Sequence, residues 1–300
     1  MIQTGPGRHP VMWLKAICLA IAAASASASG PAAAAAQALE PPLAVPPPPS
    51  LPALADEGHV HVAGARIWYG SIGRGRPVVL LHGGMSSSRA WGAQVPALVQ
   101  AGYRVVLVDS RGHGRSTMGK ARLSYARMAN DVRAVIRHLR LSRPTVVGWS
   151  DGAIVALTLA ANSGETLGGI YAFGANIDAS GVRPDAASAP ILAQVGPWLA
   201  ADYADISPTP GDFGVLRSAV REMQGQEPFL SHAQLREIRA SPVLIAGAAE
   251  DEFILPAHQQ ELAGLIPGAE LEIFRNGGHF VPWQEPESFN RSLLAFLSSG

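Results

Sequence analysis

A serine lies at the centre of a short glycine-flanked motif in the middle of the chain. Gly148, Ser150 and Gly152 form the pattern G-x-S-x-G between an apolar run at 145–147 and an apolar helical stretch at 153–161. This pattern is typical of a sharp turn from a strand to a helix, which exposes the serine hydroxyl above a sheet. The N-terminus of the following helix would also stabilise negative charge that develops close to the serine. The motif therefore predicts that Ser150 is a nucleophile.

A serine hydroxyl is a weak nucleophile at neutral pH, so it needs a general base and an acid that orients this base. His279 lies in a glycine-rich loop directly after one predicted strand, and Asp251 follows another. Both side chains would reach the sheet edge that carries Ser150. The chain order Ser, Asp, His is the order expected for a nucleophile in a G-x-S-x-G turn, its orienting acid and its base. Glu250 and Glu252 flank Asp251 and are alternatives for the acid, although the spacing to the next helix favours Asp251.

Backbone amides are the expected donors for the negative charge that forms on a substrate oxygen. Gly84 follows a glycine-rich turn after a predicted strand, and we expect its N–H to act together with that of Asp151. Met85 is the alternative to Gly84. Three aromatic side chains flank these elements and either line an apolar substrate pocket or belong to the ordinary core: Trp149, Phe280 and Trp283.

Short apolar runs alternate with longer helical patterns from residue 55 onward. This alternation predicts an α/β fold, with a parallel sheet and helices on both of its faces. The stretch 177–240 departs from it, because helical patches divided by Gly and Pro replace the strands. We therefore expect one domain over 55–300, with a helical cap inserted over 177–240 that shapes the substrate pocket.

The first residues have the order of a secretory signal peptide. Arg8 and Lys15 precede a soft apolar stretch at 16–24, after which small residues dominate. We expect a signal peptide over 1–38, cut after Ala36-Gln37-Ala38 or, alternatively, after Ala26-Ser27-Ala28. A proline- and alanine-rich linker follows over 39–54. An uncleaved anchor is the alternative, but the apolar run is shorter than the about 20 residues that a membrane span needs. The expected location is periplasmic or secreted, without a stable membrane anchor.

Composition argues against several other classes of function. Lys plus Arg and Asp plus Glu are both 23, and no basic run occurs, so we expect no nucleic-acid partner. His59 and His61 alternate along one predicted strand, but no third metal ligand lies near them, so we expect no metal site. The only cysteine, Cys18, lies in the predicted signal peptide, so the mature chain would hold no disulfide.

On these residues the chain resembles the α/β-hydrolase superfamily from about Gly58 to its C-terminus. The likeness is greatest to small esterase-like members with a short helical cap, a group that includes carboxylesterases, enol-lactonases and cofactor-free haloperoxidases. It implies a mostly parallel eight-stranded sheet flanked by helices, with a nucleophile, a base and an orienting acid. Residue 248 is alanine where many relatives carry glycine, which leaves the exact acid open. The matching residues are His82-Gly83-Gly84, the run at 109–116, Ser150, Asp251 and His279.

The predicted function is hydrolysis of carboxylic esters of small or medium molecules through an acyl-enzyme. The expected partners are the ester and water, and no metal or organic cofactor is required. Lactone, thioester or C–C bond hydrolysis, or perhydrolysis, on the same side chains is the alternative, because this fold hosts all of these reactions. A member of the fold that binds a ligand without turnover is the third hypothesis. The serine at the turn argues against epoxide hydrolases and haloalkane dehalogenases, which use a carboxylate there.

The predicted signal peptide can be tested by expressing the full chain in a bacterial host and separating cytosol, periplasm and medium. We expect the protein in the exported fractions, and N-terminal sequencing should find Leu39 as its first residue. A cytosolic protein that still begins with Met1 would contradict this prediction.

Overall fold

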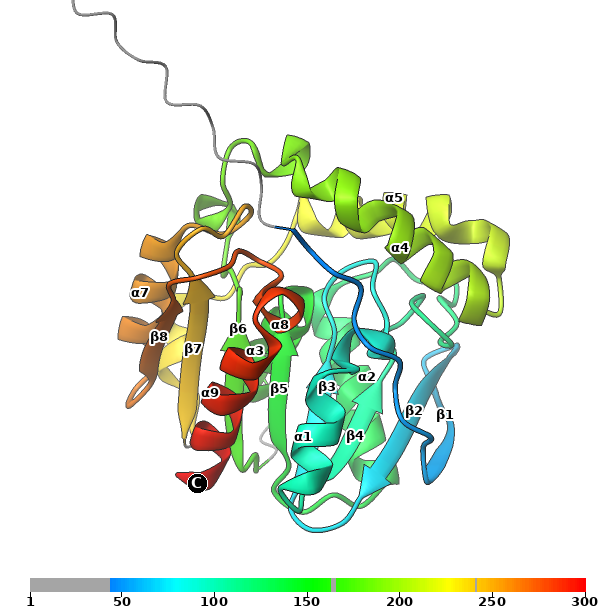
Figure 1. The fold of residues 1–300 in the computed structure, drawn as a ribbon, viewed down its shortest axis with the longest axis horizontal. Coiled ribbons are helices and arrows are strands. Elements are labelled where there is room, and N and C mark those ends of the chain that lie inside the picture. The colour runs from blue at the N-terminus through cyan, green and yellow to red at the C-terminus, as the bar shows by residue number, and fades with distance from the viewer. Residues whose placement is uncertain (1–43, 163–165, 241) are drawn as a thin grey trace, which may run out of the picture. The chain divides into compact units, whose positions relative to one another are not determined.

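The computed structural model describes residues 44–162, 166–240 and 242–300. Within these ranges eight strands form one sheet in the order β1-β2-β4-β3-β5-β6-β7-β8 (Figure 1). The β1–β2 and β2–β4 pairs are antiparallel and all other pairs are parallel, which confirms the mostly parallel eight-stranded sheet. The strands are β1 (Asp56–Val62), β2 (Ala65–Gly73), β3 (Pro77–Leu81), β4 (Arg104–Val108), β5 (Thr145–Trp149), β6 (Gly169–Phe173), β7 (Val243–Ala248) and β8 (Glu270–Phe274).

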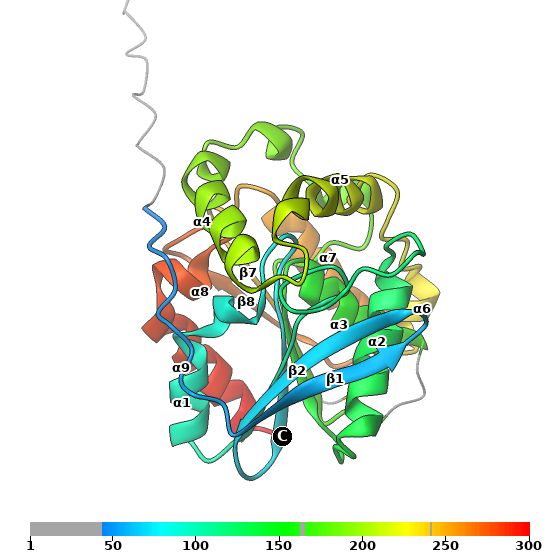
Figure 2. The ribbon, with the colours of Figure 1, turned by 90° about the vertical axis from the view of Figure 1, so that its right-hand side faces the viewer.

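Helices cover both faces of this sheet and explain why its central strands are apolar on both sides (Figure 2). One apolar core lies between the sheet and α2 (Tyr125–His138), α3 (Asp151–Asn162) and α7 (Pro256–Leu265). A second core lies on the opposite face, under α1 (Gln94–Gln100), α8 (Val281–Gln284) and α9 (Pro286–Ser298). The helix α3 is apolar almost all round because the sheet and its neighbouring helices bury it.

Helices also fill the stretch in which we expected the cap. α4 (Ile191–Ile206), α5 (Phe213–Gln224) and α6 (His232–Arg236) lie between β6 and β7 in the chain. α4 and α5 lie above the edge at which the parallel strands end (Figures 1 and 2). The cap therefore faces the sheet edge that carries the predicted catalytic residues. Four 3₁₀ turns complete the described elements: η1 (Ser88–Trp91), η2 (Ala179–Gly181), η3 (Ala186–Ser188) and η4 (Pro210–Asp212).

The end of the predicted linker lies against the domain. Leu51 and Leu54 pack on the second apolar core. A Cβ atom on Gly92 would lie 1.6 Å from the carbonyl oxygen of Pro49, so only glycine fits at position 92. The signal peptide predicted over 1–38 and the first residues of the linker lie outside the described part of the chain. In the part that is described, no helix is both long and apolar enough to cross a membrane.

A buried ion pair fastens the loop after β4 to α2. The guanidinium of Arg111 donates to Asp131 through Nε at 2.8 Å and Nη2 at 2.5 Å, and both side chains are almost fully buried. Nη2 also donates to the carbonyl of Val62 at 3.1 Å, at the end of β1. One arginine therefore holds the loop after β4, helix α2 and the end of β1 together.

Asp131→Ala should lower the free energy of unfolding by about 3–5 kcal/mol, because it leaves the buried Arg111 charge without its carboxylate. Glu237→Ala is the matched control: its exposed pair with Arg239 should contribute less than about 1 kcal/mol. Urea unfolding followed by tryptophan fluorescence measures both values. Equal losses in the two variants would show that the buried pair has no special weight.

Candidate active site

Ser150 occupies a sharp turn between β5 and α3. Its φ of +57° lies in the left-handed region, which residues other than glycine rarely adopt. Its N–H donates to the carbonyl of Phe173 at 2.8 Å, which fixes the turn to the neighbouring strand. A Cβ atom on Gly148 would lie 2.3 Å from the carbonyl oxygen of Gly152, and one on Gly152 would lie 2.2 Å from that of Leu81. Both glycines are therefore required by close backbone contacts, and the motif forms the predicted strand–turn–helix unit.

His279 and Asp251 form a buried pair at the same edge of the sheet. The ring Nδ1 lies 2.9 Å from Asp251 Oδ2 and 3.1 Å from Oδ1. Asp251 Oδ1 also accepts from the backbone N–H groups of Phe253 and Ile254, both at 2.8 Å. The carboxylate is thus held from two sides, and it orients the imidazole with Nε2 pointing away from it. Asp251 is thus the carboxylate that contacts the His279 ring.

The two rival carboxylates have other positions. Glu252 Oε2 accepts from the backbone N–H of His279 at 2.8 Å, so this side chain holds the histidine loop rather than the ring. Glu250 is exposed. Sequence reasoning considered Glu252 only as a rival for the acid and missed its contact with the loop.

Charge around His279 sets its protonation. Burial lowers the pKa of His279, but the charge and hydrogen bond of Asp251 and the charges of Glu252 and Asp151 outweigh it. The pKa is therefore raised above its ordinary value of 6.5. An imidazole stabilised as a cation in this way is suited to accept a proton.

Ser150 and His279 are linked through their neighbours. The indole N–H of Trp149 donates to the carbonyl of His279 at 2.9 Å. Gly174 follows Phe173, whose carbonyl accepts from the Ser150 N–H. A Cβ atom on Gly174 would lie 2.9 Å from Cε1 of His279, so the imidazole packs directly on this backbone. Across the described residues no hydrogen bond joins Ser150 Oγ to Nε2 of His279. Such bonds often become short only when substrate binds.

The amides predicted to hold an oxyanion lie beside Ser150. A Cβ atom on Gly83 would lie 3.3 Å from that of Ser150, so the loop after β3 packs directly on the serine. In the described ranges, the N–H groups of Gly84, Met85 and Asp151 donate to no protein acceptor. Met85 has a φ of +63°, so a second left-handed residue shapes this loop. Within the described residues, none of these three amides is therefore engaged in a hydrogen bond to the protein.

Two carboxylates hold this loop: Asp202, which the sequence pattern did not indicate, and Asp109, in the family-like run at 109–116. Asp202, on the cap helix α4, accepts from the Ser87 hydroxyl at 2.6 Å. Asp109, after β4, accepts from the Ser88 N–H at 2.8 Å. Burial raises the pKa of Asp202, although the Ser87 hydrogen bond and Arg89 oppose this effect. The loop that carries Gly84 is thus clamped between the cap and the sheet.

The three aromatic residues expected at a pocket are almost fully buried. The ring of Trp149 packs edge-on against Trp283 at 5.1 Å and against Phe280 at 5.5 Å between centroids. They contact one another within the second apolar core, and their role in substrate binding stays a prediction. Phe253, which sequence reasoning did not single out, packs edge-on against the His279 ring, with 4.8 Å between the ring centroids.

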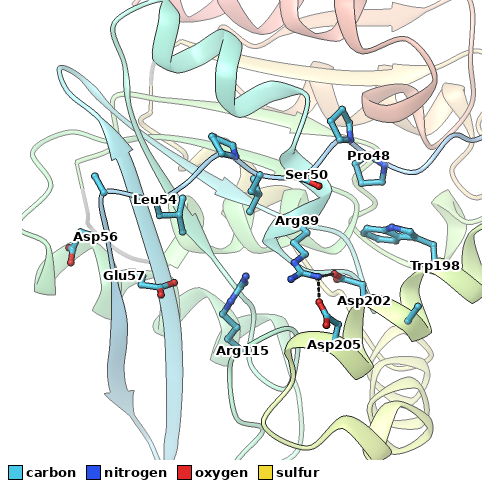
Figure 3. A pocket seen from close by; sticks show the side chains of 15 residues that line it. Pro48, Ser50, Leu54, Asp56, Glu57, Arg89, Arg115, Trp198, Asp202 and Asp205 are labelled. Atoms are coloured by element: carbon cyan, nitrogen blue, oxygen red, sulfur yellow. Dashed lines mark hydrogen bonds and ion pairs between the residues drawn. The ribbon is translucent and has the colours of Figure 1, made fainter.

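A cleft of about 940 Å³ opens between the segment before β1 and helix α4 (Figure 3). Arg89 spans part of it and pairs with Asp205 at 2.6 Å. Ser150, Asp251 and His279 are not among its lining residues. The cleft is therefore separate from the predicted catalytic side chains. His59 and His61 are exposed, and no group of three or more metal-binding side chains occurs in the ranges that the structure covers.

Comparison with known proteins defines the class. Residues 78–292 match the model of the alpha/beta hydrolase family, so the chain belongs to this family. A protein of Variovorax paradoxus (strain S110), whose name proposes a carbamate hydrolase RutD, is 30% identical over 247 residues, covering 73% of this chain and 91% of that protein. The non-heme chloroperoxidase CPO-A1 of Kitasatospora aureofaciens is 26% identical, covering 78% of this chain and 94% of that protein. The solved structure of Est816, described as an N-acyl homoserine lactone degrading enzyme, has a TM-score of 0.62 and 28% identity, covering 80% of this chain and 100% of that chain.

The charge balance at His279 can be measured by NMR titration of histidine-labelled protein, with His279→Gln to assign the signal. The midpoint should lie above 6.5. Asp251→Asn should move it below the wild-type midpoint, because the main raising cause is lost while burial continues to lower it. Glu250→Gln should leave it in place. A His279 midpoint that stays the same in the Asp251→Asn variant would refute the pairing of His279 with Asp251.

Proposed function

We propose that this hydrolase cleaves carboxylic esters of small or medium molecules through an acyl-enzyme on Ser150. The observation that carries the proposal is the buried His279–Asp251 pair, with 2.9 Å between Nδ1 and Oδ2, at the edge where the Ser150 turn ends β5. A serine, an imidazole and a carboxylate in this order form the known arrangement for acyl transfer.

In the proposed reaction, Ser150 Oγ attacks the ester carbonyl while Nε2 of His279 takes its proton. Asp251 stays ionised, holds the ring through Nδ1–H and stabilises the imidazolium. The N–H of Asp151, with that of Gly84 or Met85, donates to the developing oxyanion. The imidazolium then protonates the leaving alcohol. Water, activated by the same ring, releases the acid and restores Ser150.

Lactone hydrolysis on the same residues is the second candidate. The Est816 structure, with 28% identity, is described as a lactone-degrading enzyme. A lactone is a cyclic ester, so Ser150 and His279 would act on it in the same way. Side-by-side rates on a chain-length series of p-nitrophenyl esters and on acyl homoserine lactones distinguish the two substrate classes.

The nucleophile and base are tested with p-nitrophenyl butyrate and a fluorophosphonate probe. Ser150→Ala should abolish labelling, and Ser150→Ala and His279→Ala should each lower kcat/KM by at least about a thousandfold, because base and nucleophile act as a unit. Asp251→Asn should also lower the rate strongly. The matched control is Glu250→Gln, which removes a neighbouring carboxylate that is exposed and should leave the rate nearly unchanged.

Full probe labelling of the Ser150→Ala protein would refute the nucleophile. Equal losses in the Asp251→Asn and Glu250→Gln variants would refute the acid.

A further inference from the structure

The side chain of Asp151 is a buried carboxylate that the proposed reaction does not use. Asp151 follows Ser150 directly and is only 3% exposed. Its Oδ1 accepts from the Tyr125 hydroxyl at 2.8 Å, and both oxygens accept from Nε2 of Gln224, at 3.1 and 3.2 Å. These donors come from α2 and from the cap helix α5, and both are neutral. Among the residues that the structure describes, no cationic side chain forms an ion pair with Asp151.

This carboxylate faces the loop that carries the oxyanion donors. A Cβ atom on Gly84 would lie 2.5 Å from Asp151 Oδ2, so only glycine leaves room there. Gly84 and Ser150 are both partly exposed, which leaves this side of the carboxylate next to the space that a substrate enters. Tyr125 and Gln224 close the other sides.

The buried carboxylate of Asp151 is unfavourable for the proposed reaction with a neutral ester. Burial desolvates this carboxylate and raises the pKa of Asp151, although the hydrogen bonds from Tyr125 and Gln224 and the charges of His82 and His279 oppose this effect. While ionised, it also repels the negative charge that develops on the substrate oxygen only a short distance away. A positive charge brought by the substrate would remove both penalties, because it pairs with the carboxylate and screens the oxyanion.

We infer that Asp151 is a specificity-determining residue that selects esters with a cationic group a few bonds from the reacting carbonyl. This inference rests on the proposed ester hydrolysis and adds its substrate class. The cation would approach Asp151 Oδ2 from the partly exposed side on which Ser150 and Gly84 lie, with the Gln224 amide beside it. The Asp151 backbone N–H would donate to the oxyanion, whereas its carboxylate would pair with the positive charge of the substrate.

The test compares esters that differ only in charge. On the acyl side the pair is p-nitrophenyl 3-aminopropionate and p-nitrophenyl butyrate. On the alcohol side it is choline butyrate and its neutral isostere, 3,3-dimethylbutyl butyrate. In at least one pair the wild-type enzyme should show a cationic-to-neutral ratio of kcat/KM that falls at least about tenfold in Asp151→Asn, because the ammonium group loses its attraction to the carboxylate. Using each substrate with both proteins cancels differences in intrinsic reactivity.

Glu227→Gln is the matched control. Glu227 accepts from the Tyr125 backbone N–H at 2.9 Å and so belongs to the same network, but it does not face Gly84. This variant should keep the wild-type ratio. If Asp151→Asn fails to fold, inhibition of the wild-type enzyme by 3-aminopropylboronic acid and by butylboronic acid replaces it, and the cationic inhibitor should bind at least about tenfold more tightly.

Ratios that are the same in the wild-type and Asp151→Asn proteins for both pairs would overturn the inference, as would equal inhibition by the two boronic acids when they are used. Neither result would affect the proposed function, which hydrolysis of any of these esters through Ser150 supports. If the wild-type enzyme hydrolyses neither neutral ester nor cationic ester, the proposed function itself fails.

Discussion

The left-handed turn at Ser150 is the constraint on which the site depends. A serine at a φ of +57° costs about 1–3 kcal/mol, and the surrounding structure must hold it there. The hydrogen bond to Phe173 and the glycines at 148 and 152 do so, because they let a strand, a turn and a helix pass within backbone contact. The same close passage leaves the Asp151 amide unpaired at the start of α3. The partial exposure of Ser150, the proposed nucleophile, and the unpaired amide beside it are thus two results of one turn.

Two adjacent carboxylates in the loop after β7 contact different parts of His279. Asp251 binds the ring of His279, and Glu252 binds its backbone N–H. The first contact sets the charge and orientation of the imidazole, and the second sets the position of the loop that carries it. Because the loop after β8 has little regular structure of its own, the histidine depends on both contacts and on the Trp149 indole to stay at the sheet edge.

Sequence reasoning succeeded where the signal is local. The glycines around Ser150 predicted the turn because the motif contains all the residues that the turn needs. The choice of Asp251 over Glu252 was open, because both carboxylates belong to one tight loop and only its folded geometry decides which reaches the ring. The contact between Ser87 and Asp202 joins residues 115 positions apart and has no sequence pattern. Leu51 and Leu54 lie in a stretch whose prolines indicated a spacer, yet their apolar side chains pack on the domain.

In the proposed reaction, the cap would act on the oxyanion donors as well as shape the substrate pocket. Helix α4 supplies Asp202 to Ser87, in the loop that carries the proposed oxyanion donors Gly84 and Met85. Helix α5 supplies Gln224 to Asp151, directly beside the other donor. A displacement of either helix would therefore change the direction of a backbone amide next to Ser150. Since caps also shape substrate pockets, the same two helices would connect substrate choice to stabilisation of the oxyanion in the proposed reaction. Substitutions in this cap that alter substrate preference should thus rarely leave the rate of the chemical step untouched.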